Sequence, residues 1–418
     1  MKRKVIILST SPFPYGDNIT DGPGYRAWNL FGGLSTKHEI IILSLYESFH
    51  LKIKNEYEVK ENNFLIKCIR HKPKRISYLI EQEKPDILYL PWSSTPFLNR
   101  LKQRFPTIID YVGAGLLEQY ATKGYIPLQF LQTKLKSFWF GDLFLTAGQR
   151  ERFYLLGLLA ASKKLSHGRY DQADELIHVI PMTPPIEPPL LNKDVIQKKA
   201  GELVLLVAGA FLPWYDYTTF FEALRILSRK KKQCLQVVFM GGNPRNPRFE
   251  HNVKDLGRMS ELKEEIVYTG TVPFKQRINY YLLADVAVNI PSITIEDELS
   301  VRTRVVDYIW AGLPILTPAK DEYSAAVVEE GGGFTYKAGN SASLAQAIEE
   351  IVANPEKLKQ SKRKLCSLLK GRFNLQNYIS PLEKFIDNPY IDPARIAPTG
   401  VGSDLFLLLR DILSFLRR

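Results

Sequence analysis

Short apolar runs rich in β-branched residues recur along the chain, and segments with helical periodicity separate them. Runs that are apolar on both faces are typical of parallel strands that helices cover on both sides. In the first half the pattern predicts strands at residues 5–9, 39–45, 64–69, 87–90, 107–110, 143–146 and 177–180. After a break it predicts further strands at 202–209, 235–241, 266–270, 286–290 and 314–317. The expected fold class is α/β.

A proline-rich segment, residues 181–189, separates the two halves. Such a segment cannot continue a sheet and forms a semi-rigid hinge. Because 418 residues are too many for one ordinary core, we expect two domains, over 1–183 and 190–370. Both should be doubly wound α/β domains that face each other across a cleft. Ligands of such sheets bind beyond the carboxyl ends of the strands, so the loops there should carry the chemistry.

Two helical segments are expected after the second domain. The first covers residues 371–390 and can cross back to the first domain. The second, 403–418, is an amphipathic terminal helix with two arginines at its end. It either packs on protein or lies in the plane of a membrane, and the sequence leaves both alternatives open. Its apolar face contains Leu405, Leu408, Leu409, Ile412 and Leu416.

Composition and charge narrow the class of protein. The chain is 45% hydrophobic and 24% charged, as folded soluble proteins are. Its three cysteines have no metal-binding or disulfide spacing, and its amino terminus lacks the pattern of a signal peptide. We therefore expect a cytoplasmic protein, with association at the inner face of the membrane left open. A net charge of +12 favours anionic partners, but no nucleic-acid-binding signature is present.

The stretch 296–314, after the predicted strand at 286–290, has the most distinctive chemistry in the chain. Ser300 suits a helix N-cap, and Gly312 suits the position just beyond a helix C-terminus. These two residues predict a helix over 301–311.

The first turn of this helix is a candidate phosphate site. It contains Thr303, and its free backbone N–H groups and positive dipole end suit a diphosphate. Arg302 and Arg304 also lie in this turn, where a cation is unfavourable for the helix unless an anion binds beside it. We therefore expect an anionic ligand at this position.

Two carboxylates in the same stretch suit a sugar nucleotide, because a carboxylate accepts hydrogen bonds from two vicinal hydroxyls. With a loop before residue 301, Glu298 and Asp307 are separated by about the span from a nucleotide's ribose to its sugar. We assign Glu298 to the donor sugar and Asp307 to the ribose. The alternative is a surface ion network of Glu296, Glu298, Arg302 and Asp307.

This stretch resembles the donor-site motif of GT-B glycosyltransferases. The resemblance lies in Glu298-Leu-Ser-Val-Arg-Thr-Arg, followed by Asp307-Tyr-Ile-Trp-Ala-Gly-Leu-Pro. The likeness is greatest to family 4, in which E-G-F-G leads to E-A-M-A-x-G-x-P, and the stretch also resembles a bacterial branch of that family with an RTR-x-x-DYxWAGLP motif. Aligned on Gly312 and Pro314, Asp307 takes the second acidic position, and Glu298 lies one residue away from the first. Further resemblance lies at residues 21–26, 149–157, 209–216 and 269–274.

This chain departs from the family motif in two ways. The Gly-Phe-Gly of the usual motif is absent. Family members also place an Arg and a Lys after the first strand of the second domain to hold the diphosphate, whereas residues 210–216 contain no basic residue. We propose that Arg302, with Arg304 as second choice, supplies the missing cation and stabilises the leaving group.

The resemblance also implies residues on the loops around the cleft. In the second domain, Gly209, Ser300, Thr303 and Val272 are donor-binding positions, with Val272 near the base. Trp214 either packs over the donor or is a buried aromatic residue.

In the first domain, the resemblance places Gly22, Gly24 and Arg26 in the cleft, near the donor phosphates or the acceptor. The two glycines could equally form a tight turn. Asp110 and Tyr111 end a strand, so they face the cleft or cap the sheet edge.

The resemblance implies a GT-B fold of two Rossmann-like domains and a retaining glycosyltransferase. Such an enzyme moves a sugar from a nucleotide diphosphate to a glycan, lipid-linked or small-molecule hydroxyl, and it needs no metal. No DxD metal motif follows a suitable strand. The alternatives are a sugar-nucleotide epimerase or phosphorylase on the same fold, and a catalytically silent sugar-nucleotide-binding subunit.

Overall fold

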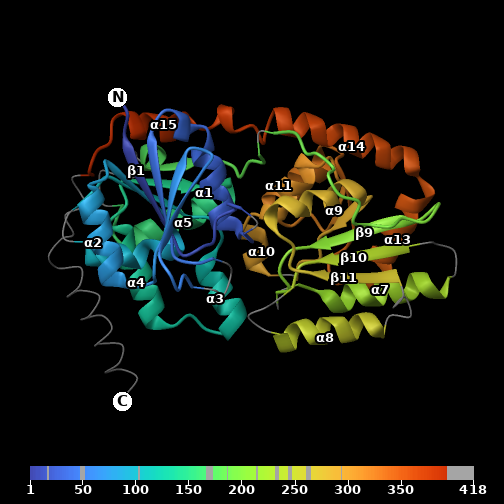
Figure 1. The fold of residues 1–418 in the computed structure, drawn as a ribbon. Helices are drawn as coiled ribbons and strands as arrows, with labels where there is room; N and C mark the ends of the chain where they lie inside the picture. Colours follow the sequence, from blue (N-terminus) through green and yellow to red (C-terminus); the bar gives the residue numbers. More distant parts are fainter. Residues whose placement is uncertain are drawn as a thin grey trace, which may run out of the picture.

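The computed structural model describes residues 1–392, except 17, 48–51, 102–103, 166–172, 186, 213–214, 231–234, 243–246, 260–264, 293 and the side chain of Asn99. Within these residues the chain forms two α/β units that lie side by side (Figure 1). The segment 403–418 lies outside the described residues, so its amphipathic helix stays a prediction. No helix in the described part of the chain is long and apolar enough to cross a bilayer.

The first domain is built on one sheet with the strand order β3-β4-β2-β1-β5-β6-β7-β8. All pairs are parallel except the hairpin of β3 with β4. Strands β5 and β6 are buried along their whole length, which is why they are apolar on both faces. The strands are β1 (Lys4–Ser9), β2 (Glu39–Ser44), β3 (Tyr57–Glu61), β4 (Phe64–Cys68), β5 (Ile87–Pro91), β6 (Thr107–Asp110), β7 (Leu143–Thr146) and β8 (Ile177–Val179).

Strand β3 was not predicted, because it is a polar edge strand whose residues are largely exposed. Asn62 and Asn63 join it to β4 with φ angles of 49° and 64°, as tight hairpins require. Helices pack around this sheet: α1 (Gly22–Gly32), α2 (Pro73–Glu83), α3 (Gly115–Lys123), α4 (Leu128–Phe138), α5 (Gln149–Ala161) and α6 (Ala173–Leu176), with 3₁₀ segments η1 (Leu34–Thr36) and η2 (Trp92–Arg100).

The second domain has an entirely parallel sheet with the order β11-β10-β9-β12-β13-β14. Its strands are β9 (Leu203–Ala208), β10 (Leu235–Met240), β11 (Ile266–Gly270), β12 (Val286–Val288), β13 (Ile315–Thr317) and β14 (Gly333–Thr335). Its helices are α7 (Tyr217–Arg229), α8 (Pro247–Arg258), α9 (Arg277–Leu283), α10 (Ile295–Leu299), α11 (Thr303–Trp310), α12 (Glu322–Glu329) and α13 (Ser341–Ala353), with the 3₁₀ turn η5 (Phe274–Gln276).

Helix α7 has a capping residue and an apolar face that its local sequence supplies. Asp216 caps it by accepting a hydrogen bond from the N–H of Thr219 at 3.0 Å. Phe220, Leu224 and Leu227 all lie buried on its inner face. The α/β fold class expected from the apolar pattern is confirmed in both halves.

The last described segment of the chain returns to the first domain. Helix α14 (Pro355–Lys370) covers the second domain, and the 3₁₀ turn η6 (Leu375–Asn377) leads to α15 (Ser380–Asp387) above the first sheet (Figure 1). Leu382, Phe385 and Ile386 of α15 are buried in the same apolar cluster as β1 and β5. The last helix therefore ties the two domains together.

Each sheet has a topological switch point, where consecutive crossovers leave a strand in opposite directions. In the first sheet this point lies between β1 and β5, and in the second between β9 and β12. Ligands of doubly wound sheets bind outside the carboxyl ends of the strands at such points. The two switch points are therefore the places to look for ligand sites.

Candidate functional site

The amino-terminal ends of two helices from different domains meet near the boundary. Helix α1 begins at Gly22 and is capped by Asp21, whose carboxylate accepts from the N–H of Gly24 at 3.1 Å. Helix α11 begins at Thr303. A Cβ atom on Gly22 would lie 3.1 Å from Cγ2 of Thr303. Two positive dipole ends so close together favour an anionic ligand between the domains.

Arg304 places a cation at the carboxyl end of β9, beside these helix ends. Its guanidinium donates to the carbonyl of Ala208 and to the hydroxyl of Tyr215, and its Cζ lies 4.6 Å from the centre of the Tyr215 ring. A Cβ atom on Gly209 would lie only 2.7 Å from this Cζ, and Gly209 has a φ of +107°. Glycine is therefore required there. Among the described residues, both hydrogen-bond acceptors of the guanidinium are neutral, so no carboxylate is bonded to it directly.

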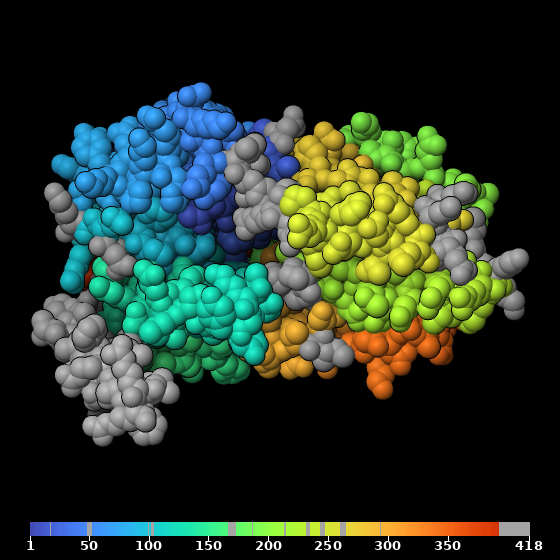
Figure 2. Space-filling view, turned by 90° about the horizontal axis from the view of Figure 1, so that it is seen from below, coloured from blue at the N-terminus to red at the C-terminus, as the bar shows by residue number. Residues whose placement is uncertain are grey.

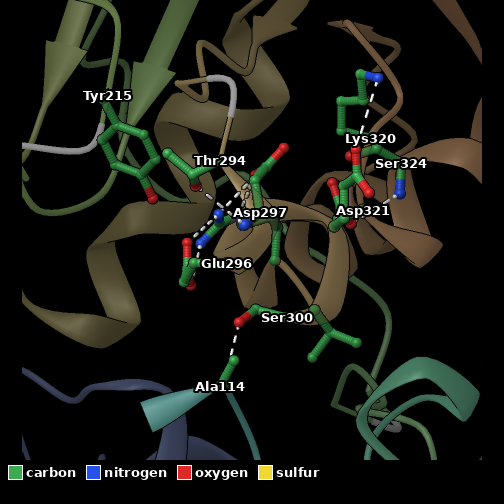
Figure 3. A network of polar contacts seen from close by, with 12 residues as sticks. Ala114, Tyr215, Thr294, Glu296, Asp297, Ser300, Lys320, Asp321 and Ser324 are labelled. Carbon is green, nitrogen blue, oxygen red and sulfur yellow. Dashed lines mark hydrogen bonds and ion pairs between the residues drawn. The ribbon is translucent and has the colours of Figure 1, made fainter. Parts of the chain in front are cut away.

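Arg302 lies in a different electrostatic setting. Its guanidinium donates to Asp297 at 2.5 and 2.8 Å and to Glu296 at 2.8 and 3.3 Å, and all three side chains are buried (Figure 3). Two carboxylates neutralise it. The choice of Arg302 as the first phosphate-binding cation is therefore corrected in favour of Arg304.

The physical reason is an unexpected helix. Residues 295–299 form α10 rather than a loop, with Thr294 as the N-cap that accepts from the N–H of Asp297 at 3.3 Å. This helix turns Glu296 and Asp297 toward Arg302. Ser300 is consequently the C-cap of α10 and not the N-cap of α11. Its hydroxyl instead accepts from the N–H of Ala114 in the first domain at 3.0 Å (Figure 3).

Glu298 lies on the exposed face of the same short helix. Its side chain is 47% exposed and lies 3.8 Å from the ammonium of Lys320. The assignment of Glu298 to the donor sugar stays a prediction, and its neighbours Glu296 and Asp297 are the buried carboxylates of α10. Because a helix rotates about 100° per residue, a neighbouring position can lie on another face.

Asp307 is buried on α11 and belongs to a mixed aromatic and charged cluster at the domain boundary. Its carboxylate accepts from Arg277 at 2.9 Å and from the Tyr281 hydroxyl at 3.3 Å. The Arg277 guanidinium lies 3.8 Å from the Phe274 ring centre and 4.9 Å from that of Tyr25, a residue of the first domain. Burial raises the pKa of Asp307, while Arg277 acts in the opposite direction.

No sequence motif contains Arg277, so it could not be predicted as a residue of this cluster. Val272, in the loop after β11, is half-buried against the second-domain core. Two residues farther on, the N–H of Phe274 donates to the carbonyl of Asn18 in the first domain at 3.2 Å. This loop therefore lies at the domain boundary, as its predicted position near the base requires. Trp214 lies outside the described residues.

Arg26, Asp110 and Tyr111 were expected at the cleft, but they are core residues of the first domain. The Arg26 guanidinium donates to Asp110 at 2.7 Å and to the carbonyl of Ile180 at 2.8 Å, and the Tyr89 hydroxyl also donates to Asp110. Arg26 and Tyr111 are each 1% exposed, and Asp110 is 3% exposed. The cleft assignment is wrong for all three, because a charged pair that satisfies itself can be buried under the strand ends.

Gly24 is likewise explained by packing. A Cβ atom there would lie 2.1 Å from the carbonyl oxygen of Pro12, so the glycine permits a close approach of α1 to the loop after β1. Of the two glycines in this loop, Gly22 is the one that borders the second domain.

Glu151 is a boundary residue that we did not identify from the sequence, although residues 149–157 belong to the resemblance. Its carboxylate is fully buried and accepts from the N–H groups of Gly113 at 2.8 Å, Ala147 at 2.9 Å and Val301 at 3.3 Å. It therefore links two first-domain loops to the entrance of α11. Burial raises the pKa of Glu151 to about 7, against the lowering effect of the three N–H groups.

We expect this carboxyl to make stability depend on pH. Its pKa is raised from 4.5 to about 7, so the folded protein binds the proton more tightly than the unfolded chain does. Its contribution is therefore greatest at acidic pH and is lost as pH rises toward and through 7. Replacement by glutamine should reduce the fall in unfolding free energy between acidic and mildly alkaline pH by roughly 1–3 kcal/mol. Urea titrations of the wild type and the glutamine variant across this pH range test the prediction. Identical dependence of the unfolding free energy on pH in the two proteins would contradict it.

Comparison with known proteins agrees with this geometry. Residues 191–364 match the family model described as glycosyl transferases group 1. Sucrose-phosphate synthase from Thermosynechococcus elongatus has a TM-score of 0.73 at 13% identity, covering 92% of this chain and 98% of that one. Anabaena HepE in complex with UDP has a TM-score of 0.64 at 12% identity, covering 93% and 100%. WaaG, a glycosyltransferase involved in lipopolysaccharide biosynthesis, has 0.62 at 12% identity, covering 92% and 100%.

No curated protein sequence matches the chain. The fold is nevertheless GT-B, with two Rossmann-like domains. The glycosyl transferases group 1 match covers the second domain, and the solved structures support the fold of the whole chain.

Proposed function

We propose that this protein is a retaining, metal-independent glycosyltransferase of family 4. It moves a sugar from a nucleotide diphosphate to a hydroxyl of a glycan, a lipid-linked sugar or a small acceptor. The observation that carries the proposal is the meeting of the α1 and α11 helix starts beside Arg304, a cation whose described partners are all neutral. This is an arrangement suited to a diphosphate.

The proposed chemistry follows from where negative charge develops. When the bond between the sugar and the diphosphate breaks, charge accumulates on the departing phosphate. Arg304 and the backbone N–H groups at the start of α11 would stabilise that charge, and preorganised donors of this kind are usually a large part of catalysis. The second domain would hold the donor, and the acceptor hydroxyl would approach from the first domain.

Asp307 remains our candidate for the ribose. Its two carboxylate oxygens offer about four acceptor positions, and Arg277 and Tyr281 use two of them. The vicinal hydroxyls of a ribose could use the rest. Arg277 would then keep the carboxylate ionised and oriented.

The test is to measure binding and transfer separately. We expect a UDP sugar or a related donor to stabilise the protein by about 2.7 kcal/mol at a concentration one hundred times its dissociation constant. UDP-glucose is the first donor to try, since a structural relative was solved in complex with it. Stabilisation by no nucleotide diphosphate would contradict the proposal.

The alternatives give different products. Donor binding without turnover would indicate a silent binding subunit, and an isomerised donor in the absence of any acceptor would indicate an epimerase. NMR of the product's anomeric proton tests retention, and inversion would contradict that part of the proposal. Unchanged turnover in the presence of EDTA is expected, and loss of turnover would show a metal requirement.

A further inference from the structure

The first domain has a cavity at its own switch point, away from the helix starts of the donor site. The cavity has a volume of about 660 Å³. It is lined by Thr10, His71, Pro73, Ser93, Pro96, Phe97, Arg100 and Thr133. Thr10 follows β1 and Ser93 follows β5, the two strands between which the crossovers reverse direction. The cavity therefore lies where a doubly wound sheet is expected to bind a ligand.

The location suits a second substrate. Seen from below, the surface of the molecule is hollowed between the blue part of the first domain and its teal helices (Figure 2). The carboxyl end of β1 borders the cavity at Thr10, and the following loop leads directly to α1 at Gly22. A ligand in the cavity would thus lie on the same edge of the sheet as the proposed diphosphate site.

The walls of the cavity combine hydroxyl groups with aromatic faces. The Thr10 hydroxyl lies 3.2 Å from that of Ser93, and its N–H donates to Ser94 at 3.0 Å. On the other side, the His71 ring packs edge-on against Phe97, with centroids 5.5 Å apart. Hydroxyl groups beside an aromatic face suit a sugar ring, which offers both hydroxyls and an apolar C–H face.

The charge around the cavity is positive. Among the described residues that line the cavity, Arg100 carries a charge, and its side chain is exposed. Lys134 follows the lining residue Thr133 and is only 4% exposed. Its ammonium donates to the carbonyl of Trp92 at 2.6 Å and lies 4.3 Å from the Trp92 ring centre.

Lys134 thus has partners, but none of those recorded among the described residues is a carboxylate. Burial lowers the pKa of Lys134 to about 7. An anion that binds nearby favours the charged form of such a lysine and gains free energy from it. Pro73, at the start of α2, adds a positive helix end to the border of the cavity.

We propose that this cavity binds the acceptor and that the acceptor is an anionic sugar, with its phosphate or carboxylate group facing Arg100. The proposal rests on the proposed glycosyltransferase function, because it names the substrate class for the first domain. The sugar ring would lie between the hydroxyls of Thr10 and Ser93 and the His71–Phe97 wall. Lys134 would act through the electric field rather than by contact.

The test uses the full-length protein and three sugars that differ in charge: glucose 6-phosphate, glucuronate and glucose. Titration calorimetry at physiological ionic strength should give at least one of the two anionic sugars about tenfold tighter binding than glucose, as expected for one charge-assisted hydrogen bond. The better anionic sugar distinguishes a phosphate from a carboxylate. Equal affinity for all three sugars would overturn the proposal.

Two variants test whether the sugars bind in this cavity. Arg100→Gln should weaken the binding of the anionic sugar by about tenfold and leave the affinity for glucose unchanged. Arg363→Gln, an exposed change on α14 of the other domain, is the matched control and should change nothing. Thr133→Trp should fill the cavity and weaken the binding of all three sugars. An anionic sugar that keeps its affinity in Arg100→Gln, or that UDP displaces competitively, is not bound in this cavity and would refute the assignment.

Stabilisation by UDP, measured in parallel on each variant, separates the two proposals. We expect UDP to stabilise wild type, Arg100→Gln and Thr133→Trp equally. If UDP fails to stabilise the wild-type protein while the sugar results are as expected, the donor assignment fails and the anion-binding cavity stands. If UDP binds and the anionic sugars show no preference, the cavity proposal alone fails.

Discussion

Arg304→Gln is expected to lower the rate of sugar transfer by about 10²–10³-fold, the range found when one preorganised donor to a developing negative charge is removed. The guanidinium lies at the carboxyl end of β9, against Gly209 and the hydroxyl of Tyr215. Glutamine is polar but two bonds shorter, so the contact with the carbonyl of Ala208 is weakened as well. What it removes is the positive charge beside the two helix starts.

The measurement is kcat and KM for the donor, together with the denaturation midpoint. Arg304→Lys should recover part of the loss, because it restores charge without the planar geometry of the guanidinium. An unfolding midpoint close to that of the wild type is required for the result to count. Full activity in Arg304→Gln would show that the diphosphate is held elsewhere.

The variant Arg302→Met should be compared with Arg304→Gln in stability and in donor affinity. It leaves Glu296 and Asp297 as buried carboxylates without their cation, so its main effect should be on folding rather than on donor affinity. A stable Arg302→Met protein that had selectively lost donor binding would restore the original assignment of Arg302 and count against Arg304.

The sequence predicted the fold well because both sheets are built from strands that are apolar on both faces. This signal is local and survives without any tertiary information. The helix start marked Thr303 and Arg304, and the family resemblance marked Gly209, as donor-binding positions, a role that stays a prediction. The structure places all three near one another, next to Gly22 of the first domain.

The choice between Arg302 and Arg304 could not be made from the sequence. Both lie near the start of one helix, and the difference comes from α10, a five-residue helix whose carboxylates reach Arg302. The direction of the Glu298 side chain could not be predicted either, because it depends on whether residues 295–299 are helical. Glu151 escaped notice because its partners are backbone N–H groups from three separate segments. Such pairings follow from tertiary structure alone.

The burial of Arg26 in the first domain likewise could not be predicted from the sequence. Its replacement is expected to have a large effect on stability. Arg26→Met should lower the free energy of unfolding by about 3–5 kcal/mol, because it leaves the carboxylate of Asp110 buried without its cation. The carbonyls of Ile180 and Thr146 lose a donor at the same time. Urea unfolding followed by tryptophan fluorescence measures the change, since Trp28, Trp92 and Trp139 lie in the first domain.

The double variant Arg26→Met/Asp110→Leu is the control for this buried pair. Replacing both charges with apolar side chains should recover much of the lost stability, although the Tyr89 hydroxyl then loses its acceptor. Folded Arg26→Met protein should still bind UDP, because the guanidinium lies within the first-domain core rather than at the cleft. Unchanged stability combined with lost ligand binding would instead place Arg26 in the site, as the loop motif around Gly22 and Gly24 first suggested.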